Sequence, residues 1–130
     1  MDQLVAILLS LILSVTGINR TVDPVLVADA QRRVVEIQTD WRHNGTTPYE
    51  VLHFNQYASD PVATAIQAWQ NSPDHWRVLT YRGFTRIGCA IDVDETMTYW
   101  FACSFGESVV QLEPKVEPRV VLPDTAMSDE

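Results

Sequence analysis

The chain has 130 residues, of which 46% are hydrophobic and 20% are charged, and its net charge is −8. These values describe one globular domain with its own core, and they exclude a disordered chain, a collagen-like repeat and a multidomain enzyme. Phosphate groups attract basic surfaces, so an acidic chain argues against nucleic acid as a partner and against binding to an anionic membrane surface.

A long apolar segment at the start is the first candidate helix. Residues 4–18 are mostly aliphatic, but the acidic start Met1-Asp2-Gln3 and the lack of an A-x-A-like site make no convincing signal peptide. The apolar run of about 15 residues is also shorter than the roughly 20 that span a bilayer. We expect a helix buried on most of its circumference, with a targeting or anchoring segment as the alternative. Small or polar residues recur along one helical face: Gln3, Ala6, Ser10, Ser14 and Gly17.

Three further helices are predicted where a capping residue precedes a proline, at Asp23-Pro24, Asp60-Pro61 and Ser72-Pro73. Apolar residues follow the first two starts at spacings of three and four, which predicts their buried faces. These residues are Val27, Ala30, Val34, Ile37 and Trp41, then Val62, Ala65, Ile66 and Trp69. The pattern Thr47-Pro48-Tyr49-Glu50 has the form of a capping box and predicts one more short helix.

The pattern then changes to two predicted strands, 87–93 and 99–105, that form a hairpin centred on Thr96. This register gives one wholly apolar face and places Cys89 opposite Cys103, within reach of a disulfide. Such a bridge would stabilise the fold by about 3 kcal/mol in the chain-entropy model. Two reduced core cysteines are the alternative.

The last part of the chain differs in composition from the rest. Residues 109–130 are acidic and interrupted by prolines, and we expect them to form an extension to a domain that covers residues 1–108. Its short apolar runs could lie as extended strands on the body or on a neighbour. Together with the helix at 4–18, this extension predicts contacts with other protein subunits.

Several motifs occur in an order that resembles the CAP superfamily, which includes cysteine-rich secretory proteins and bacterial SCP-like domains. They are His43-Asn44-Gly45, the run AWQNSPDH at 68–75, IGCA at 87–90 and YWFACSFG at 99–106. The resemblance implies an α+β fold, a three-layer α-β-α sandwich with a small antiparallel sheet. It also implies that residues 4–18 form the family's first helix and that Cys89 and Cys103 form the hairpin bridge of some members.

CAP domains carry two histidines and two acids around a central cleft, and His43 and His75 match the two histidines. The acids do not match: Phe54 stands where one glutamate is expected, so the tetrad is degenerate. Around these positions the resemblance predicts a set of cleft residues, none of them assigned a catalytic role: His43, Glu50, His53, Asn55, Asp74 and His75.

Two imidazoles can bind a divalent ion such as Zn²⁺, but a metal site needs three or four ligands. His43 and His75 are the candidate ligands, and the third is Glu50, His53 or Asp74. Glu50 is expected one helical turn before His53. A hydrolase needs a tuned acid or base beside a nucleophile or water, and the missing acids argue against one.

The sequence therefore predicts a non-enzymatic interaction or structural module with no required cofactor. Its expected setting is extracellular or a larger assembly such as a phage particle. The alternative is a metal-dependent hydrolase or a lipid-binding CAP domain that uses the cleft of His43 and His75.

Overall fold

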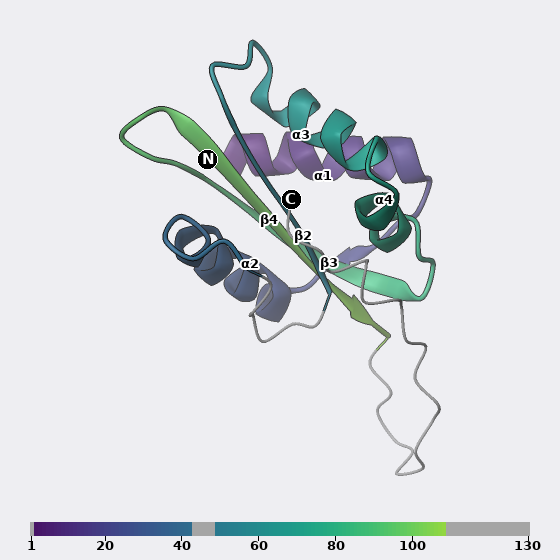
Figure 1. Cartoon of the computed structure of the whole chain (residues 1–130). Helices are drawn as coiled ribbons and strands as arrows, with labels where there is room; N and C mark the ends of the chain where they lie inside the picture. Colours follow the sequence, from purple (N-terminus) through teal and green to yellow (C-terminus); the bar gives the residue numbers. More distant parts are fainter. Residues whose placement is uncertain (1, 43–48, 109–130) are drawn as a thin grey trace.

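A computed structural model describes residues 2–42 and 49–108 of the chain, and it has three layers (Figure 1). A twisted sheet lies between helix α2 on one face and helices α1, α3 and α4 on the other, as expected for an α-β-α sandwich. The elements are α1 (Asp2–Thr16), β1 (Thr21–Val22), α2 (Pro24–Glu36), β2 (Glu50–Gln56), α3 (Pro61–Gln70), α4 (Pro73–Leu79), β3 (Phe84–Val93) and β4 (Thr98–Glu107).

The three helices predicted from capping residue and proline begin where expected. The Asp23 carboxylate accepts a hydrogen bond from the Val25 amide at 2.8 Å, and the Asp60 carboxylate accepts one from the Ala63 amide at 3.1 Å. These bonds satisfy amides that a first helical turn leaves without partners. Ser72 precedes α4 but makes no such bond to the helix backbone. Its hydroxyl is used elsewhere, at the candidate site.

The sheet is mixed, with the strand order β1-β3-β4-β2. The expectation of a small antiparallel sheet is correct for β2, β3 and β4 but wrong for β1, which runs parallel to β3 beside Arg86 and Ile87. A two-residue strand is too short for any periodic signal. β1 therefore covers only the start of β3.

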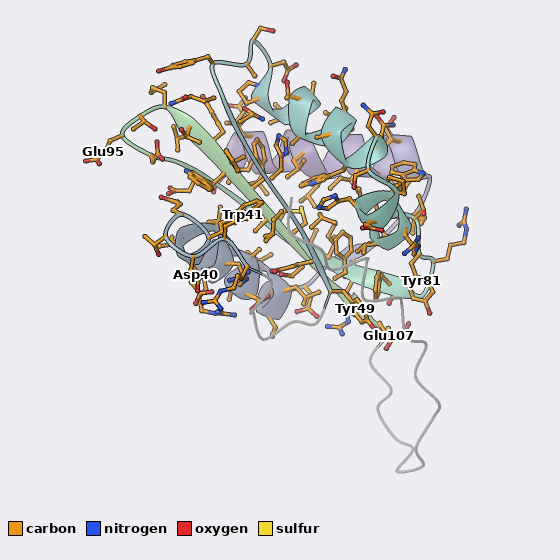
Figure 2. All side chains as sticks on the ribbon, in the orientation of Figure 1. Asp40, Trp41, Tyr49, Tyr81, Glu95 and Glu107 are labelled. Carbon is orange, nitrogen blue, oxygen red and sulfur yellow. A yellow bond between two sulfur atoms is a disulfide. The ribbon has the colours of Figure 1, made fainter. Side chains whose placement is uncertain are left out.

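The predicted hairpin register is confirmed, because Ile87 pairs with Phe105 and Cys89 with Cys103. The two cysteines form a disulfide with their Cα atoms 4.1 Å apart. The strands extend a few residues beyond the predicted limits. Glu95, at the turn between them, lies at the opposite end of the sheet from Glu107 (Figure 2).

The predicted short helix at Glu50 is wrong, since this residue begins strand β2. All seven residues of β2 pair with β4, from Glu50 opposite Ser104 to Gln56 opposite Thr98. A capping-box pattern is a local signal, and pairing with a neighbouring strand outweighs it. Neighbouring side chains on a strand point to opposite faces, so β2 contributes to both sides of the sheet.

Helix α1 forms as predicted, but the expectation that most of its circumference is buried is wrong. Only Leu8 and Ile12 are buried, while the predicted stripe of small or polar residues is exposed. The helix covers one side of the sheet as an outer layer, so one stripe alone contacts the core. Among the residues that the structure describes, no helix has the length and apolar character needed to cross a bilayer.

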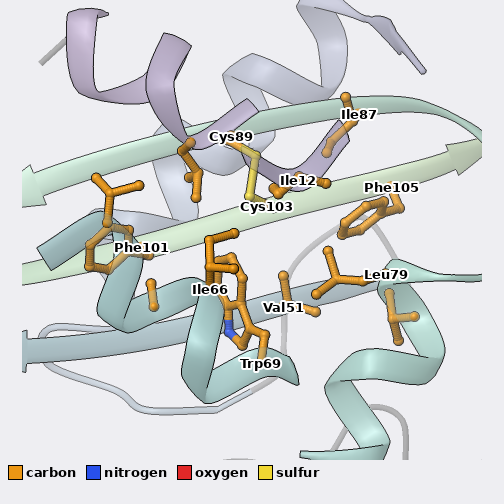
Figure 3. Packing of buried hydrophobic residues seen from close by; sticks show 14 of the residues in the cluster. Ile12, Val51, Ile66, Trp69, Leu79, Ile87, Cys89, Phe101, Cys103 and Phe105 are labelled. Carbon is orange, nitrogen blue, oxygen red and sulfur yellow. A yellow bond between two sulfur atoms is a disulfide. The ribbon is translucent and has the colours of Figure 1, made fainter. Parts of the chain in front are cut away.

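The sheet separates two cores of different character. The core under α1, α3 and α4 contains large side chains around the disulfide, including Ile66 and Trp69 of α3 and Ile12 of α1 (Figure 3). The core under α2 is small and contains Ala30, Val34, Ile37, Leu52, Ala90 and Ala102. α2 also lies very close to the sheet at Gly88, where an added Cβ would collide with the backbone of Leu26 and Val27.

Candidate functional site

Strand β2 separates the predicted cleft residues onto opposite faces of the sheet. Val51 belongs to the core under α1, α3 and α4, whereas Leu52 belongs to the core under α2. By this alternation Glu50 faces α2, while His53 and Asn55 face the three helices. The hypothesis that Glu50 lies one helical turn before His53 and shares its site is therefore wrong.

Glu50 forms a buried ion pair with Arg33 of α2. Its two carboxylate oxygens each accept a hydrogen bond of 2.9 Å, one from Nε and one from Nη2 of Arg33. The side chains are 1% and 0% exposed. Burial alone would lower the pKa of Arg33, but its hydrogen bonds to Glu50 and Glu36 outweigh this effect and raise the pKa. The pair fixes the position of α2 on the sheet.

Arg33 makes two further contacts that bring chain segments together on this face. Its Nη1 donates to the Glu36 carboxylate at 2.8 Å, and its Nη2 donates to the backbone carbonyl of Arg42. Sequence analysis missed this residue, although it lies beside Val34 on the inner side of the predicted helix. A charged residue next to a buried stripe is the signal that could have identified it.

His53 lies on the opposite face, in a mostly apolar environment. Its ring centroid is 5.8 Å from that of Phe101 and 6.3 Å from that of Trp69. Burial, and secondarily the charge of His75, lower the pKa of His53 from 6.5 to about 4. Its Nε2 is buried and has no hydrogen-bond partner among the described residues. His53 is therefore neutral near pH 7.

His75 lies in the first turn of α4 and is 2% exposed. Its Nδ1 lies 2.8 Å from the Ser72 hydroxyl, which explains why Ser72 does not cap the helix backbone. The electrostatic interaction between His53 and His75 shows that the fold brings these two candidates together. The order of the sequence motifs predicted His75 as a site residue. Its closeness to His53 could not be predicted in the same way, because it depends on β2 being a strand.

The other predicted cleft residues have structural contacts. Asn55 Nδ2 donates a hydrogen bond of 3.0 Å to the Pro61 carbonyl, which ties β2 to the start of α3. Asp74 lies 3.8 Å from Arg77 of its own helix. His43 lies outside the described residues, so its predicted meeting with His75 stays a prediction.

A metal centre needs several ligands that converge on one point. In residues 2–42 and 49–108, no three His, Cys, Asp or Glu side chains form such a group. Two imidazoles, His53 and His75, are the donors that the described fold brings together. His43 and the residues around it lie outside that range.

Phe54, the residue expected to replace a glutamate, points to the α2 face and is 48% exposed. It stacks on Trp100, its partner in the register of β2 and β4, with ring centroids 5.0 Å apart. Trp41 contacts Phe54 edge-on at 5.3 Å. Sequence analysis missed this aromatic cluster because the pairing of Phe54 with Trp100 required β2.

A family model described as the cysteine-rich secretory protein family, CAP, matches residues 20–105. The match begins after α1, so the assignment of residues 4–18 to the family's first helix stays a prediction. A comparison with curated protein sequences gives no match.

Solved structures share the fold at low sequence identity. An outer surface protein from Borrelia burgdorferi aligns with a TM-score of 0.65 and 19% identity, over 81% of this chain and 92% of that one. An extracellular protein with an SCP domain from Bacillus anthracis aligns with a TM-score of 0.56 and 15% identity, over 83% of this chain and 40% of that one.

A cysteine-rich secretory protein from Staphylococcus aureus aligns with a TM-score of 0.55 and 15% identity, over 80% of this chain and 38% of that one. These likenesses concern the fold alone. The family model, in contrast, spans well over half of the chain, and the chain therefore belongs to the CAP family of cysteine-rich secretory proteins.

Proposed function

We propose that this CAP domain is a non-enzymatic interaction module that associates with a second copy of itself through the outer face of α1. The observation that carries this proposal is the composition of that face. Ile7 and Leu13 are 45% and 44% exposed on a helix whose buried stripe contains only Leu8 and Ile12. Exposed aliphatic side chains of this size favour burial against a partner.

The geometry of the face suits packing against another helix. At 100° per residue, Ile7 and Leu13 lie on either side of the exposed stripe that contains Ala6, Ser10 and Ser14. Small residues let a neighbouring helix approach closely, and the flanking aliphatic side chains then fill its grooves. A two-fold dimer would bury this face on both copies.

The state of the cleft supports a non-enzymatic role. Glu50, a predicted cleft residue, lies on the opposite face of the sheet, bound to Arg33, and the depressed pKa of His53 makes its imidazole a weak base near pH 7. General acid–base catalysis works best with a group whose pKa is close to the working pH. The described cleft residues therefore serve the fold better than they would serve proton transfer.

An extracellular setting, or a place in a larger assembly such as a virion, belongs to the same proposal. The Cys89–Cys103 disulfide is favoured in oxidising surroundings. Two of the similar structures are described as an outer surface protein and an extracellular protein.

Light scattering across a concentration series tests the proposed association. We expect the wild-type mass to rise toward a dimer at high micromolar concentration and the Ile7→Lys/Leu13→Lys variant to remain monomeric. Val25→Lys/Val35→Lys is the matched control, because these aliphatic side chains are also exposed but lie on α2, and it should leave the association unchanged. A wild-type protein that stays monomeric, or a lysine variant that still dimerises, would overturn the proposal.

A metal-dependent or lipid-binding use of the cleft is the second candidate function, and one observation favours its metal-binding form. The unpartnered Nε2 of His53 lies on the face where His75 is a neighbour, and neutral imidazoles are the usual nitrogen ligands of Zn²⁺. Calorimetric titration with zinc chloride should then give binding that His53→Gln and His75→Gln each weaken. Absence of heat in the wild type would remove this candidate.

A further inference from the structure

An apolar groove lies between α1 and α2 at the edge of the sheet, outside the candidate cleft. Its volume is about 450 Å³, and its walls include Val5 and Leu9 of α1 and Val27 and Val34 of α2. Cys89 and Ile91 of β3 form its floor. The groove therefore follows the side of β3 that faces away from β4.

The backbone of β3 is open along this groove. The Asp23 amide donates to the Ile87 carbonyl at 3.0 Å, so Ile87 directs its polar backbone groups toward β1 and away from β4. By strand alternation Cys89 and Ile91 direct theirs the same way, but β1 reaches only Arg86 and Ile87. Within residues 2–42 and 49–108, no hydrogen bond satisfies these outward groups of Cys89 and Ile91.

One end of the groove is acidic. Asp2 at the start of α1 and Asp92 of β3 both contribute to its lining. α1 begins on the side of the turn between β3 and β4 and runs toward β1 (Figure 1). An occupant that pairs with β3 would therefore suit this groove best with a basic residue near Asp92 and apolar residues toward Val22 of β1.

We propose that Arg119–Leu122 of the same chain occupies this groove as a strand antiparallel to β3. This segment lies outside the described residues, and its sequence, Arg119 followed by Val-Val-Leu, has the required order of charge and apolar character. β-Branched valines favour strands. Pro123 has no backbone N–H to donate to a neighbouring strand. It follows Leu122 at the point where β1 begins to cover the edge of β3.

The length of the intervening chain permits this pairing within one molecule. The hydroxyl of Ser108, the last described residue, lies 3.0 Å from that of Thr85 at the start of β3. Residues 109–118 can span up to about 33 Å, whereas the stretch of β3 from Thr85 to Asp92 is about 24 Å long. Tethering raises the effective concentration of the segment, so its own chain is favoured over a second copy.

Amide hydrogen exchange of the full chain, read by NMR, tests the proposal. We expect the Cys89 and Ile91 amides to be protected and Val121→Asp to lower that protection by about tenfold or more, because a carboxylate enters the apolar groove. Val116→Asp places the same charge elsewhere in the extension and is the matched control. It should leave both amides unchanged.

Unprotected Cys89 and Ile91 amides in the wild type would overturn the proposal, as would protection that Val121→Asp does not reduce. Protection that disappears on dilution would assign the groove to a second copy and would also overturn pairing within one chain. Because Ile7 and Leu13 do not line this groove, the Ile7→Lys/Leu13→Lys variant should keep the protection. Failure of one proposal therefore leaves the other testable.

Discussion

The two faces of the sheet are covered by different means. Three helices cover one face with large aromatic and aliphatic side chains around a disulfide. A single helix, α2, covers the other over a smaller core of alanine, valine, isoleucine and leucine and adds the buried pair of Arg33 and Glu50. One amphipathic helix has a narrow apolar stripe. A buried ion pair can therefore set the position of a helix whose apolar contact is small.

The largest expected effect comes from breaking the pair under α2. Arg33→Met leaves the Glu50 carboxylate buried without its guanidinium and should lower the free energy of unfolding by about 3–5 kcal/mol. Urea denaturation measures this loss. The double variant Arg33→Met/Glu50→Met should regain most of it, because both charges are removed.

Arg77→Met is the control on the opposite face, since Arg77 and Asp74 are 40% and 28% exposed. An exposed pair contributes about 0–1 kcal/mol. Equal losses for Arg33→Met and Arg77→Met would remove the contrast between the faces.

The disulfide should contribute somewhat less than the ion pair. Replacing both Cys89 and Cys103 by alanine opens a loop of sequence separation 14 and should cost about 3 kcal/mol in urea denaturation. A reducing agent should lower the stability of the wild type but not that of the variant. A wild-type denaturation midpoint that is the same with and without reductant would contradict this prediction.

The smallest expected effect is the pH dependence of His53. Its pKa falls from 6.5 in the unfolded chain to about 4 in the folded one. Between these values the unfolded chain binds a proton that the folded chain does not, so stability decreases as pH falls through this range. Over the measured range from pH 6.5 to 4.5 the loss is about 2 kcal/mol, and it ends below the folded pKa.

His53→Gln should remove this slope between pH 6.5 and 4.5, measured by urea denaturation at each pH. The lowered pKa values of Asp23 and Glu36 affect stability mainly below this window. An unchanged slope in the variant would show that another group titrates there.

The sequence predicted the elements that have strong local signals. Asp-Pro and Ser-Pro pairs marked the starts of α2, α3 and α4, and apolar alternation fixed the register that joins Cys89 to Cys103. Glu50 was predicted in a helix because its capping-box spacing is a clear local signal, while its pairing with Ser104 is a long-range contact. The exposure of α1 was missed for the same reason, since burial depends on what packs against a helix.

The candidate site was predicted in part. His75 and His53 were both predicted as cleft residues. Their proximity follows from β2 being a strand, and so does the position of Glu50 on the other face of the sheet. Arg33 was missed because helical periodicity counts apolar positions and gives no account of a charge whose partner lies in another element.

The alternation along β2 has a consequence for how this chain can change in evolution. Inserting one residue between Val51 and His53 would exchange the sides of the sheet for every later position of the strand. His53 would then turn toward α2, while Phe54 would turn toward His75 and Trp69. Length changes of two residues preserve the assignment of sides, so relatives that keep both faces should vary here in even steps.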